Sequence, residues 1–555
     1  MLKARALFPL LLLTSMLFAQ EPPHHHALAD SELGSVDFKT SCAIAVQAPF
    51  NRAVALLHSF EYDEARLTFE SIAKQDPNCA MAYWGIAMTR LHGLWGEFNA
   101  PAGKAAVAEA KKLAAAPRTT ARERQYIDAI AEIFSDEAIH RTDRPDNKPN
   151  SEGYAAPDRD SESAYAAKMS ALHGAYPDDK EAAIFHALAL DIVGRKAAND
   201  YANEKQCDDI LEPLVKSMPN HPGVAHYLIH CNDSPALAQR GLAAAREYAK
   251  IAPASAHATH MPSHIFIQVG DWDSTIASNV TSLDAAEHDK DASACERLGN
   301  AQHALDFMTY GLLQAGRMAD AKKDLRQSLH LAEEIPGAKD CDRDDAFPQA
   351  VYAITARDWQ LARTLAPKTN AAVYRNFILL TAGLGAANTA DHAGAKQIIA
   401  QLKEWHDQLP AGAQRSKDWT LVSQLWIAGA DAESTNDLDA AATLYRQAAE
   451  VQERMSAVGS IFPSARQSLG EVLMRAGKAK EASTELAIVE KYLPNRFDLL
   501  YDSAQAAEKS GDRAAALAYY QKLLKVAETK ERPEVTIALQ RTTELQKTQH
   551  AALSQ

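Results

Sequence analysis

The stretch HYLIHCNDSPALAQRGLAAAREYAKIAPASAHATHMPSHIF, residues 226–266, contains the same histidine pair twice. His226 and His230 are four positions apart, and His260 and His264 repeat that spacing further along the chain, each offset from its counterpart by the same step. A step of about 34 residues is typical of helix–turn–helix units that stack side by side into a solenoid. Residues four apart lie on one face of an α-helix, so the two pairs are expected to face the same way on successive repeats.

The same period occurs near both ends of the chain. The segment FNRAVALLHSFEYDEARLTFESIAKQDP, residues 50–77, has two apolar stripes at helical spacing separated by a short turn. Near the C-terminus, four positions recur after the same step: Gly470, Gly477, Ala482 and Leu486 return as Ala504, Gly511, Ala516 and Tyr520. Together with a composition rich in alanine and leucine, this pattern predicts an all-α fold, an α-solenoid of helical hairpins.

These residues make the chain resemble the tetratricopeptide repeat (TPR) family over nearly all of its length after the N-terminal segment. The residues that carry the resemblance are Ala53, Ala65, Phe69, Pro77, Gly470, Gly477, Ala482, Leu486, Pro494, Gly511, Ala516 and Tyr520. The phrases CAMAYWG, HYLIH and HMPSHIF are similar to a subgroup of exported bacterial TPR proteins, to which we attach no activity. The resemblance implies a right-handed superhelix whose first helices line a concave groove for a peptide or protein.

Composition divides the chain into segments. Residues 1–19 are predicted to be a signal peptide, because Lys3 and Arg5 precede an apolar run that ends at the small Ala19. A flexible leader containing His24 to His26 follows at 20–38. An N-terminal array at 39–355 includes a polar loop at 136–163 and a histidine-rich groove at 222–310. A C-terminal array at 356–545 precedes a polar tail at 546–555. We therefore expect a periplasmic or secreted protein with no stable membrane span after cleavage.

Cysteine and charge content narrow the function classes. The six cysteines suit an oxidising compartment, and successive pairing (42–79, 207–231, 295–341) would link neighbouring helices. Six cysteines allow 15 connectivities, and this is one of them. Of its three disulfides, we expect Cys42–Cys79, since these cysteines flank one hairpin. The formal net charge of −14 and the lack of a basic patch argue against a nucleic-acid partner.

The turn residues of the repeats assign the histidines to a face. Counting back from Gly477 and from Pro494 reaches the same polar positions, Gln467 and Glu471. The same steps back from Gly270 reach His260 and His264, and those from Pro253 reach His226 and His230. The histidines are thus predicted to lie off the hairpin core, on the groove face. Pro262 leaves one alternative open: a helix that begins there would place His260 outside it and distort the second pair.

Two H-x-x-x-H pairs on adjacent helices predict a single transition-metal ion held by His226, His230, His260 and His264, with Zn or Cu as the expected metal. His257, one turn before His260, is a further candidate ligand, and His303 and Asp306 on the next first helix are others. His58 and His92 are separated by the same repeat step, but each stands alone on its repeat. Groove lining or aromatic packing is the alternative for both.

Three functions are compatible with these features. The first is an exported TPR scaffold that binds a peptide or protein and holds a transition metal through groove histidines. The second is a metal-dependent enzyme, a hydrolase or an oxidoreductase, that uses the same histidines. The third is an interaction scaffold without metal. The scaffold with metal is preferred, because no general base is evident from the sequence.

Overall fold

The computed structural model describes residues 32–142, 149, 153–194, 200–289, 292–341, 343–369, 372–409, 413–455 and 461–553. The predicted signal peptide and most of the predicted leader lie outside these residues. The final helix runs from Pro533 to Leu553 and so includes most of the segment predicted to be a polar tail.

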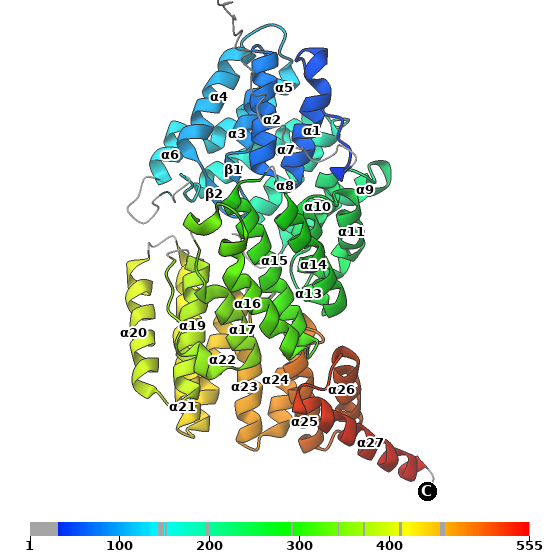
Figure 1. Cartoon of the computed structure of the whole chain (residues 1–555), viewed down its shortest axis with the longest axis vertical. Helices are drawn as coiled ribbons and strands as arrows, with labels where there is room; N and C mark the ends of the chain where they lie inside the picture. The colour runs from blue at the N-terminus through cyan, green and yellow to red at the C-terminus, as the bar shows by residue number, and fades with distance from the viewer. Residues whose placement is uncertain are drawn as a thin grey trace, which may run out of the picture.

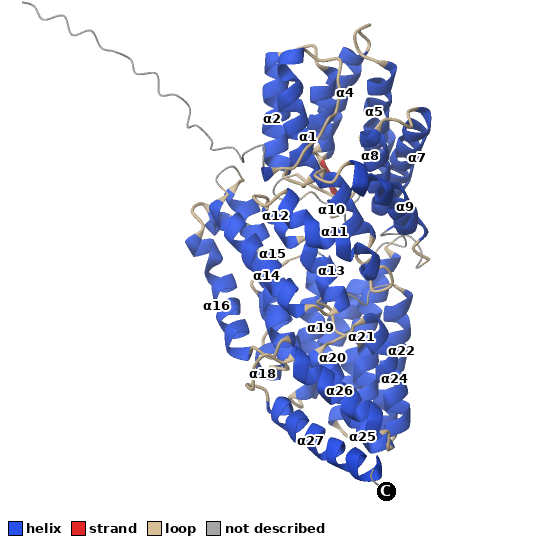
Figure 2. Cartoon of the chain, turned by 90° about the vertical axis from the view of Figure 1, so that its right-hand side faces the viewer, coloured by secondary structure: helices blue, strands red, loops and turns tan. Residues whose placement is uncertain are grey.

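The described chain is an all-α solenoid of TPR-like helical hairpins, as predicted (Figures 1 and 2). The N-terminal elements are η2 (Ile44–Val46), α1 (Gln47–His58), α2 (Tyr62–Gln75), α3 (Ala80–Met88), β1 (Leu91–His92), β2 (Glu97–Phe98), α4 (Ala100–Ala114), α5 (Ala121–Ile133), α6 (Asp136–Thr142), α7 (Arg159–Ala175), α8 (Lys180–Gly194) and α9 (Ala202–Ser217). The central elements are α10 (Pro222–Cys231), α11 (Ala238–Ile251), α12 (Ala256–His260), α13 (Pro262–Val269), α14 (Trp272–His288), α15 (Ala294–Gln314), α16 (Met318–Glu334), η3 (Ala338–Asp340), α17 (Ala346–Ala356) and α18 (Trp359–Ala362). The C-terminal elements are α19 (Ala372–Asn388), α20 (His392–Gln408), α21 (Gln414–Ser434), α22 (Leu438–Arg454), α23 (Ala465–Arg475), α24 (Ala479–Tyr492), α25 (Phe497–Ser510), α26 (Arg513–Val526) and α27 (Pro533–Leu553).

Glycines end the first helix of several hairpins. Gly270, Gly316, Gly477 and Gly511 all have positive φ, between 69° and 90°. A side chain strains the backbone in this region, and glycine does not. Gly270 and Gly477, from which the sequence register was counted, therefore occupy the same structural position.

The segment predicted as a polar loop at 136–163 is partly helical, which corrects that prediction. Helix α6 occupies Asp136–Thr142, and α7 already begins at Arg159. Asp158 accepts a hydrogen bond from the Ser161 amide and caps α7, and Arg141 pairs with the same carboxylate. Helix capping by polar side chains therefore explains why parts of this polar segment are helical.

The apolar core does not divide at residue 355. One large cluster of buried side chains extends from Leu33 to Cys231, and another from Ala256 to Ala506. A smaller cluster, from Ala225 to Phe266, lies between them. The histidine stretch therefore occupies the junction of the two large cores, and the second core continues across the predicted array boundary.

The C-terminal hairpins return to the middle of the chain. The indole Nε1 of Trp272 donates to the carbonyl of Asn495 over 2.8 Å, and the Phe497 amide donates to Gln314 Oε1 over 2.8 Å. The Glu528 amide likewise donates to the Ala315 carbonyl. In Figure 1 the orange and red helices accordingly lie below the green ones. The C-terminal part is thus closed on itself, and the seam lies between α13–α15 and α25–α26.

The three disulfides join successive cysteines: Cys42–Cys79, Cys207–Cys231 and Cys295–Cys341. The predicted Cys42–Cys79 pair is therefore confirmed. Among the described helices, none has the length and apolar character that crossing a membrane requires.

Candidate metal centre

The histidines of the central stretch form two clusters, which differs from the single predicted cage. The first triad is His226, His230 and His257, and the second triad is His260, His264 and His303. Within each triad, one nitrogen of every ring lies within 4.8 Å of the others. The two H-x-x-x-H pairs therefore separate, and each takes a third imidazole. Of the additional candidates, His257 and His303 supply these third imidazoles, whereas Asp306 belongs to neither group.

Helices α10 and α12 build the first triad. His226 and His230 lie one turn apart on α10, and their Nε2 atoms are 3.0 Å apart. His257 on α12 places its Nε2 3.1 Å from that of His226. The Nδ1–H of His226 donates to the carbonyl of His58 over 2.6 Å. Because a carbonyl only accepts, this contact leaves the Nε2 lone pair of His226 directed at the other two rings.

Helices α12, α13 and α15 build the second triad. His260 ends α12, and Pro262 begins α13, as the sequence allowed. His260 and His264 still lie on one face across this break, because Met261 has right-handed helical dihedrals and keeps α12 and α13 nearly continuous. The Nε2 atoms of His260 and His264 are 3.0 Å apart. His303 on α15 packs its ring 4.4 Å from that of His260.

The protons of the second triad are assigned by its hydrogen bonds. The Asn279 amide nitrogen donates to the Thr275 carbonyl, so Asn279 Oδ1 faces His260 Nδ1 at 2.7 Å and accepts a hydrogen bond from its N–H. His264 Nδ1 donates to Asp233 Oδ2 over 2.8 Å. Both Nε2 atoms therefore carry lone pairs in the neutral rings, and they face each other. Two acceptors at this distance repel each other unless a cation lies between them.

This arrangement has the features of a metal site. Imidazole ligands commonly donate their second nitrogen to a carboxylate or carbonyl, which fixes the tautomer and the ring orientation. Asp233, Asn279 and the His58 carbonyl do so here. Tetrahedral zinc with bonds of ~2.0–2.1 Å places its nitrogen ligands about 3.3 Å apart. The observed Nε2 separations are slightly shorter than this and lengthen with small ring movements.

His226, His230 and His260 are buried and do not line an open groove, which corrects the prediction, whereas His257, His264 and His303 are partly exposed. His226 is 0 % exposed, His230 6 % and His260 2 %. Burial lowers the pKa of His257 and His260 well below the ordinary value, and it lowers the pKa of His303 to about 3. The rings of His257, His260 and His303 are therefore neutral near pH 7, which is the form that binds metal. Counting residues identified the helix face but not the elements that cover it.

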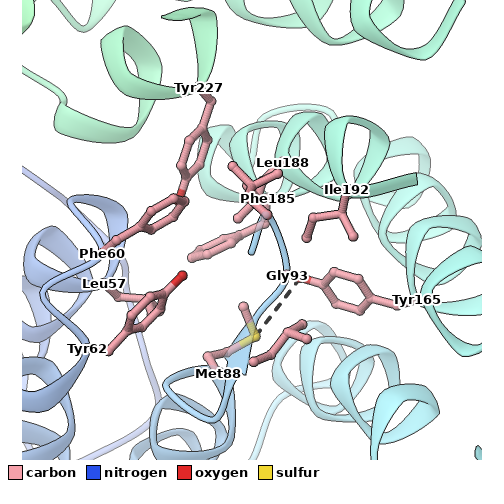
Figure 3. A pocket seen from close by; sticks show the side chains of 12 residues that line it. Leu57, Phe60, Tyr62, Met88, Gly93, Tyr165, Phe185, Leu188, Ile192 and Tyr227 are labelled. Carbon is pink, nitrogen blue, oxygen red and sulfur yellow. Dashed lines mark hydrogen bonds between the residues drawn. The ribbon is translucent and has the colours of Figure 1, made fainter. Parts of the chain in front are cut away.

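Phe60 covers the first triad. It lies in the turn between α1 and α2 with a φ of 60°, which is unusual for a side chain of this size. Its ring centroid is 4.4 Å from that of His226 and 5.4 Å from that of His257. The other side of Phe60 borders a small apolar cavity, shown in Figure 3, which Tyr62, Met88, Tyr165 and Ile192 also line. The volume open to water-sized spheres is about 10 Å³.

His58 belongs to a separate buried network. Its Nε2 contacts Glu181 Oε2 at 2.9 Å, and His221 Nε2 contacts Glu181 Oε1 at 2.9 Å. The hydroxyl of Tyr227 lies 2.9 Å from His58 Nδ1. Burial alone would raise the pKa of Glu181, but the two imidazoles lower it below its usual range. His58, Glu181 and His221 could also hold a cation. Their clearest role is to fix the His58 backbone, whose carbonyl orients His226.

The remaining candidates are not near either triad's ligand atoms. His92 lies on β1, not on a helix, and its ring stacks between Tyr62 and Tyr154 at 4.1 and 4.4 Å. It joins no metal-binding group among the described residues. Asp306 is buried on α15, and burial together with nearby Asp324 raises its pKa well above the ordinary value. Sequence reasoning missed Asp233, Asn279, His221 and Glu181, because nothing in their spacing relates them to the histidine pairs.

A larger cavity of about 460 Å³ lies in the C-terminal half. Its lining includes Gln467 and Glu471, which the sequence register assigned to the groove face, together with Tyr310 and Gln505. Arg357 enters it and lies 2.7 Å from Glu471, with Asp498 and Asp502 close by. The predicted groove face is therefore an open, charged surface here, whereas it is buried at His226, His230 and His260.

No protein-family model and no curated protein matches the sequence. Among solved structures, the chain is similar to human IFIT1, a dimer with PPP-AAAA, at 12 % identity and a TM-score of 0.37, covering 81 % of this chain and 91 % of that one. It is also similar to the APC/C hetero-tetramer Cut9–Hcn1, at 11 % identity and a TM-score of 0.35, covering 90 % and 89 %. Nothing about the site follows from likenesses at this level.

Proposed function

We propose that this protein is an exported helical scaffold that binds a transition metal at each of its two histidine triads, with Zn or Cu as the expected metal. The observation that carries the proposal is the second triad, where hydrogen bonds commit both Nδ1 protons and leave two Nε2 lone pairs 3.0 Å apart. Burial lowers the pKa of His260 well below its ordinary value, and a bound cation removes the repulsion between the two lone pairs.

Metal content tests this proposal directly. The mature protein should be purified without an affinity tag, in a variant with glutamine at His24, His25 and His26, so that these leader histidines do not bind metal. Elemental analysis should find close to two transition-metal ions per chain. Separate His230→Ala and His264→Ala variants should each lose about one ion. A His330→Ala control should lose none, because His330 is exposed on α16 and its Nδ1 contacts the Arg326 carbonyl. A chain that carries no metal and gains no thermal stability from added Zn or Cu would contradict the proposal.

We also propose that a peptide or protein partner binds in the 460 Å³ cavity of the C-terminal half. Its volume is within the range of ligand sites, and its lining mixes aromatic side chains such as Trp359 and Trp426 with charged ones. Peptides selected from a random library on the wild-type protein should lose binding to an Ala430→Phe variant, in which the larger side chain fills the cavity. The matched control is Ala441→Phe, a buried position on α22 that does not line the cavity. Unchanged peptide binding by a folded Ala430→Phe variant would reject this cavity.

A further inference from the structure

We infer that the two triads hold a pair of copper ions and pass one electron from each to dioxygen. This inference rests on the proposed function, because it requires that the triads bind metal. It narrows the metal to copper and the chemistry to redox.

The ligand set favours an ion of low charge. The groups that converge in each triad are imidazoles, and among the described residues no carboxylate or thiolate joins either group. Neutral ligands do not compensate the charge of the ion, and the Asp233 carboxylate contacts the second triad only from behind the His264 ring. The cost of burying an ion rises steeply with its charge. A single positive charge is therefore easier to accommodate than two. Among the transition metals that imidazole binds well, copper has a stable monovalent form.

The surroundings favour redox chemistry over hydrolysis. A hydrolytic centre needs a base that faces the metal-bound water. The nearest carboxylate, Asp233, is already engaged through both oxygens, with His264 Nδ1 at 2.8 Å and Gln268 Nε2 at 3.2 Å. Asp306, which the sequence offered as a carboxylate ligand, belongs to neither triad. The side chains that face the rings are mainly aromatic, including Phe60 at the first triad and Phe307 at the second.

The two triads are immediate neighbours. His257 and His260 lie on the single short helix α12, and each belongs to a different triad. Residues three apart on a helix have Cβ atoms about 5–6 Å apart. Asp233, which orients His264, lies three residues after His230 of the other triad. Two one-electron centres held this closely suit an acceptor that takes two electrons.

The cavity beside Phe60 suits a small uncharged molecule. Its volume of about 10 Å³ has room for roughly one molecule of the size of water, and most of its lining is apolar. Phe60, which lines the cavity in Figure 3, also packs its ring against His226 of the first triad. An organic substrate does not fit this space, so we take the electron acceptor to be a small diffusible oxidant, dioxygen. In the reaction, each of two Cu(I) ions would lose one electron and become Cu(II), and dioxygen would take both electrons and one proton from each of two water molecules. Hydrogen peroxide and two hydroxide ions are the products.

The test uses the mature chain with its leader histidines replaced by glutamine, loaded with Cu(I) without oxygen and then mixed with dioxygen. Two coppers should oxidise per chain, with one dioxygen consumed and one hydrogen peroxide released. His257→Ala and His303→Ala should each keep one copper, and their oxidation by dioxygen should slow at least ten-fold. His330→Ala should behave as the wild type. Ferricyanide, which takes one electron at a time, should oxidise all the forms at similar rates. If an alanine variant melts early, the glutamine variant at that position replaces it.

The outcomes separate this inference from the proposed function. If two coppers bind but the single-site variants react with dioxygen as fast as the wild type, the paired redox centre is wrong and metal binding stands. If an equal concentration of Zn²⁺ displaces Cu(I) from both triads, the preference for copper is wrong. If neither copper nor zinc binds, the proposed function itself fails.

Discussion

At the scale of single residues, the second triad depends on side chains that would not themselves touch a metal. Asp233 lies in the turn after α10, yet its carboxylate fixes the tautomer of His264 on α13. Asn279 on α14 does the same for His260. Partners of this kind hold the ligand rings in place before a metal arrives, so they contribute to affinity without adding a bond to the ion.

Replacing Asp233 with asparagine should weaken metal binding at the second triad by roughly 10–100-fold and leave the first triad unchanged. His264 and Gln268 contact different oxygens of the carboxylate, and an amide keeps an oxygen at only one of these two positions. Competition with a chromophoric chelator gives the two affinities separately. Asp284→Asn is the matched control, because Asp284 contacts His288 at 3.3 Å on the protein surface, away from both triads. Equal affinities in the wild type and Asp233→Asn would show that this hydrogen bond does not prepare the site.

At the scale of elements, the repeat pattern predicted the hairpins well, because each one repeats the same packing of small and large apolar residues. Gly477 and Gly511 end first helices as the register required. The histidine pairs were placed on the correct helices, but their grouping was not predicted. It depends on the break between α12 and α13 and on the α1–α2 turn, which brings Phe60 over α10 although the two are far apart in sequence. Long-range contacts of this kind leave no periodic signal.

Helices α15 and α16 contain a buried acidic pair that should make stability depend on pH. Burial raises the pKa of Asp324 on α16 to about 7, although Thr309 donates a hydrogen bond to it, and Asp306 lies nearby on α15. The folded protein therefore holds this proton more tightly than the unfolded chain does. The stabilisation is complete below the unfolded pKa of ~3.9 and is lost as the pH rises through about 7.

Asp324→Asn should accordingly stabilise the protein at pH 8 relative to the wild type and have little effect at pH 5. The expected difference between the two pH values is a few kcal/mol, since one pKa unit corresponds to about 1.4 kcal/mol. Urea unfolding at both pH values measures it. Asp320→Asn, an exposed position on the same helix, serves as the control and should change stability similarly at the two pH values. A wild-type stability that does not fall between pH 5 and pH 8 relative to Asp324→Asn would contradict the assignment.

At the scale of the whole molecule, the closure of the C-terminal half was not predicted. Repeats alone indicate a curved array, but the turn before α25 packs against the end of α13. There Trp272 donates to the Asn495 carbonyl, and Gly270 lies directly under Pro494. This seam joins residues more than 220 positions apart. It holds α15, which carries His303, between the second triad and the 460 Å³ cavity. Closure thus connects the candidate metal centre to the candidate partner site through one helix.

Two glycines allow the seam to be tested in isolation. Gly270 and Gly477 both end the first helix of a hairpin, with φ values of 69° and 74°. A Cβ at Gly477 would meet nothing within 4 Å, whereas one at Gly270 would lie 2.3 Å from the Pro494 carbonyl oxygen. Gly477→Ala should therefore cost only the backbone strain, about 1–2 kcal/mol. Gly270→Ala should cost that strain and also displace α25 from α13, adding roughly 1–3 kcal/mol. Chemical unfolding gives the two costs, and small-angle scattering should show a larger radius of gyration for Gly270→Ala alone. Equal costs and equal radii would mean that the C-terminal hairpins do not close onto α13 in solution.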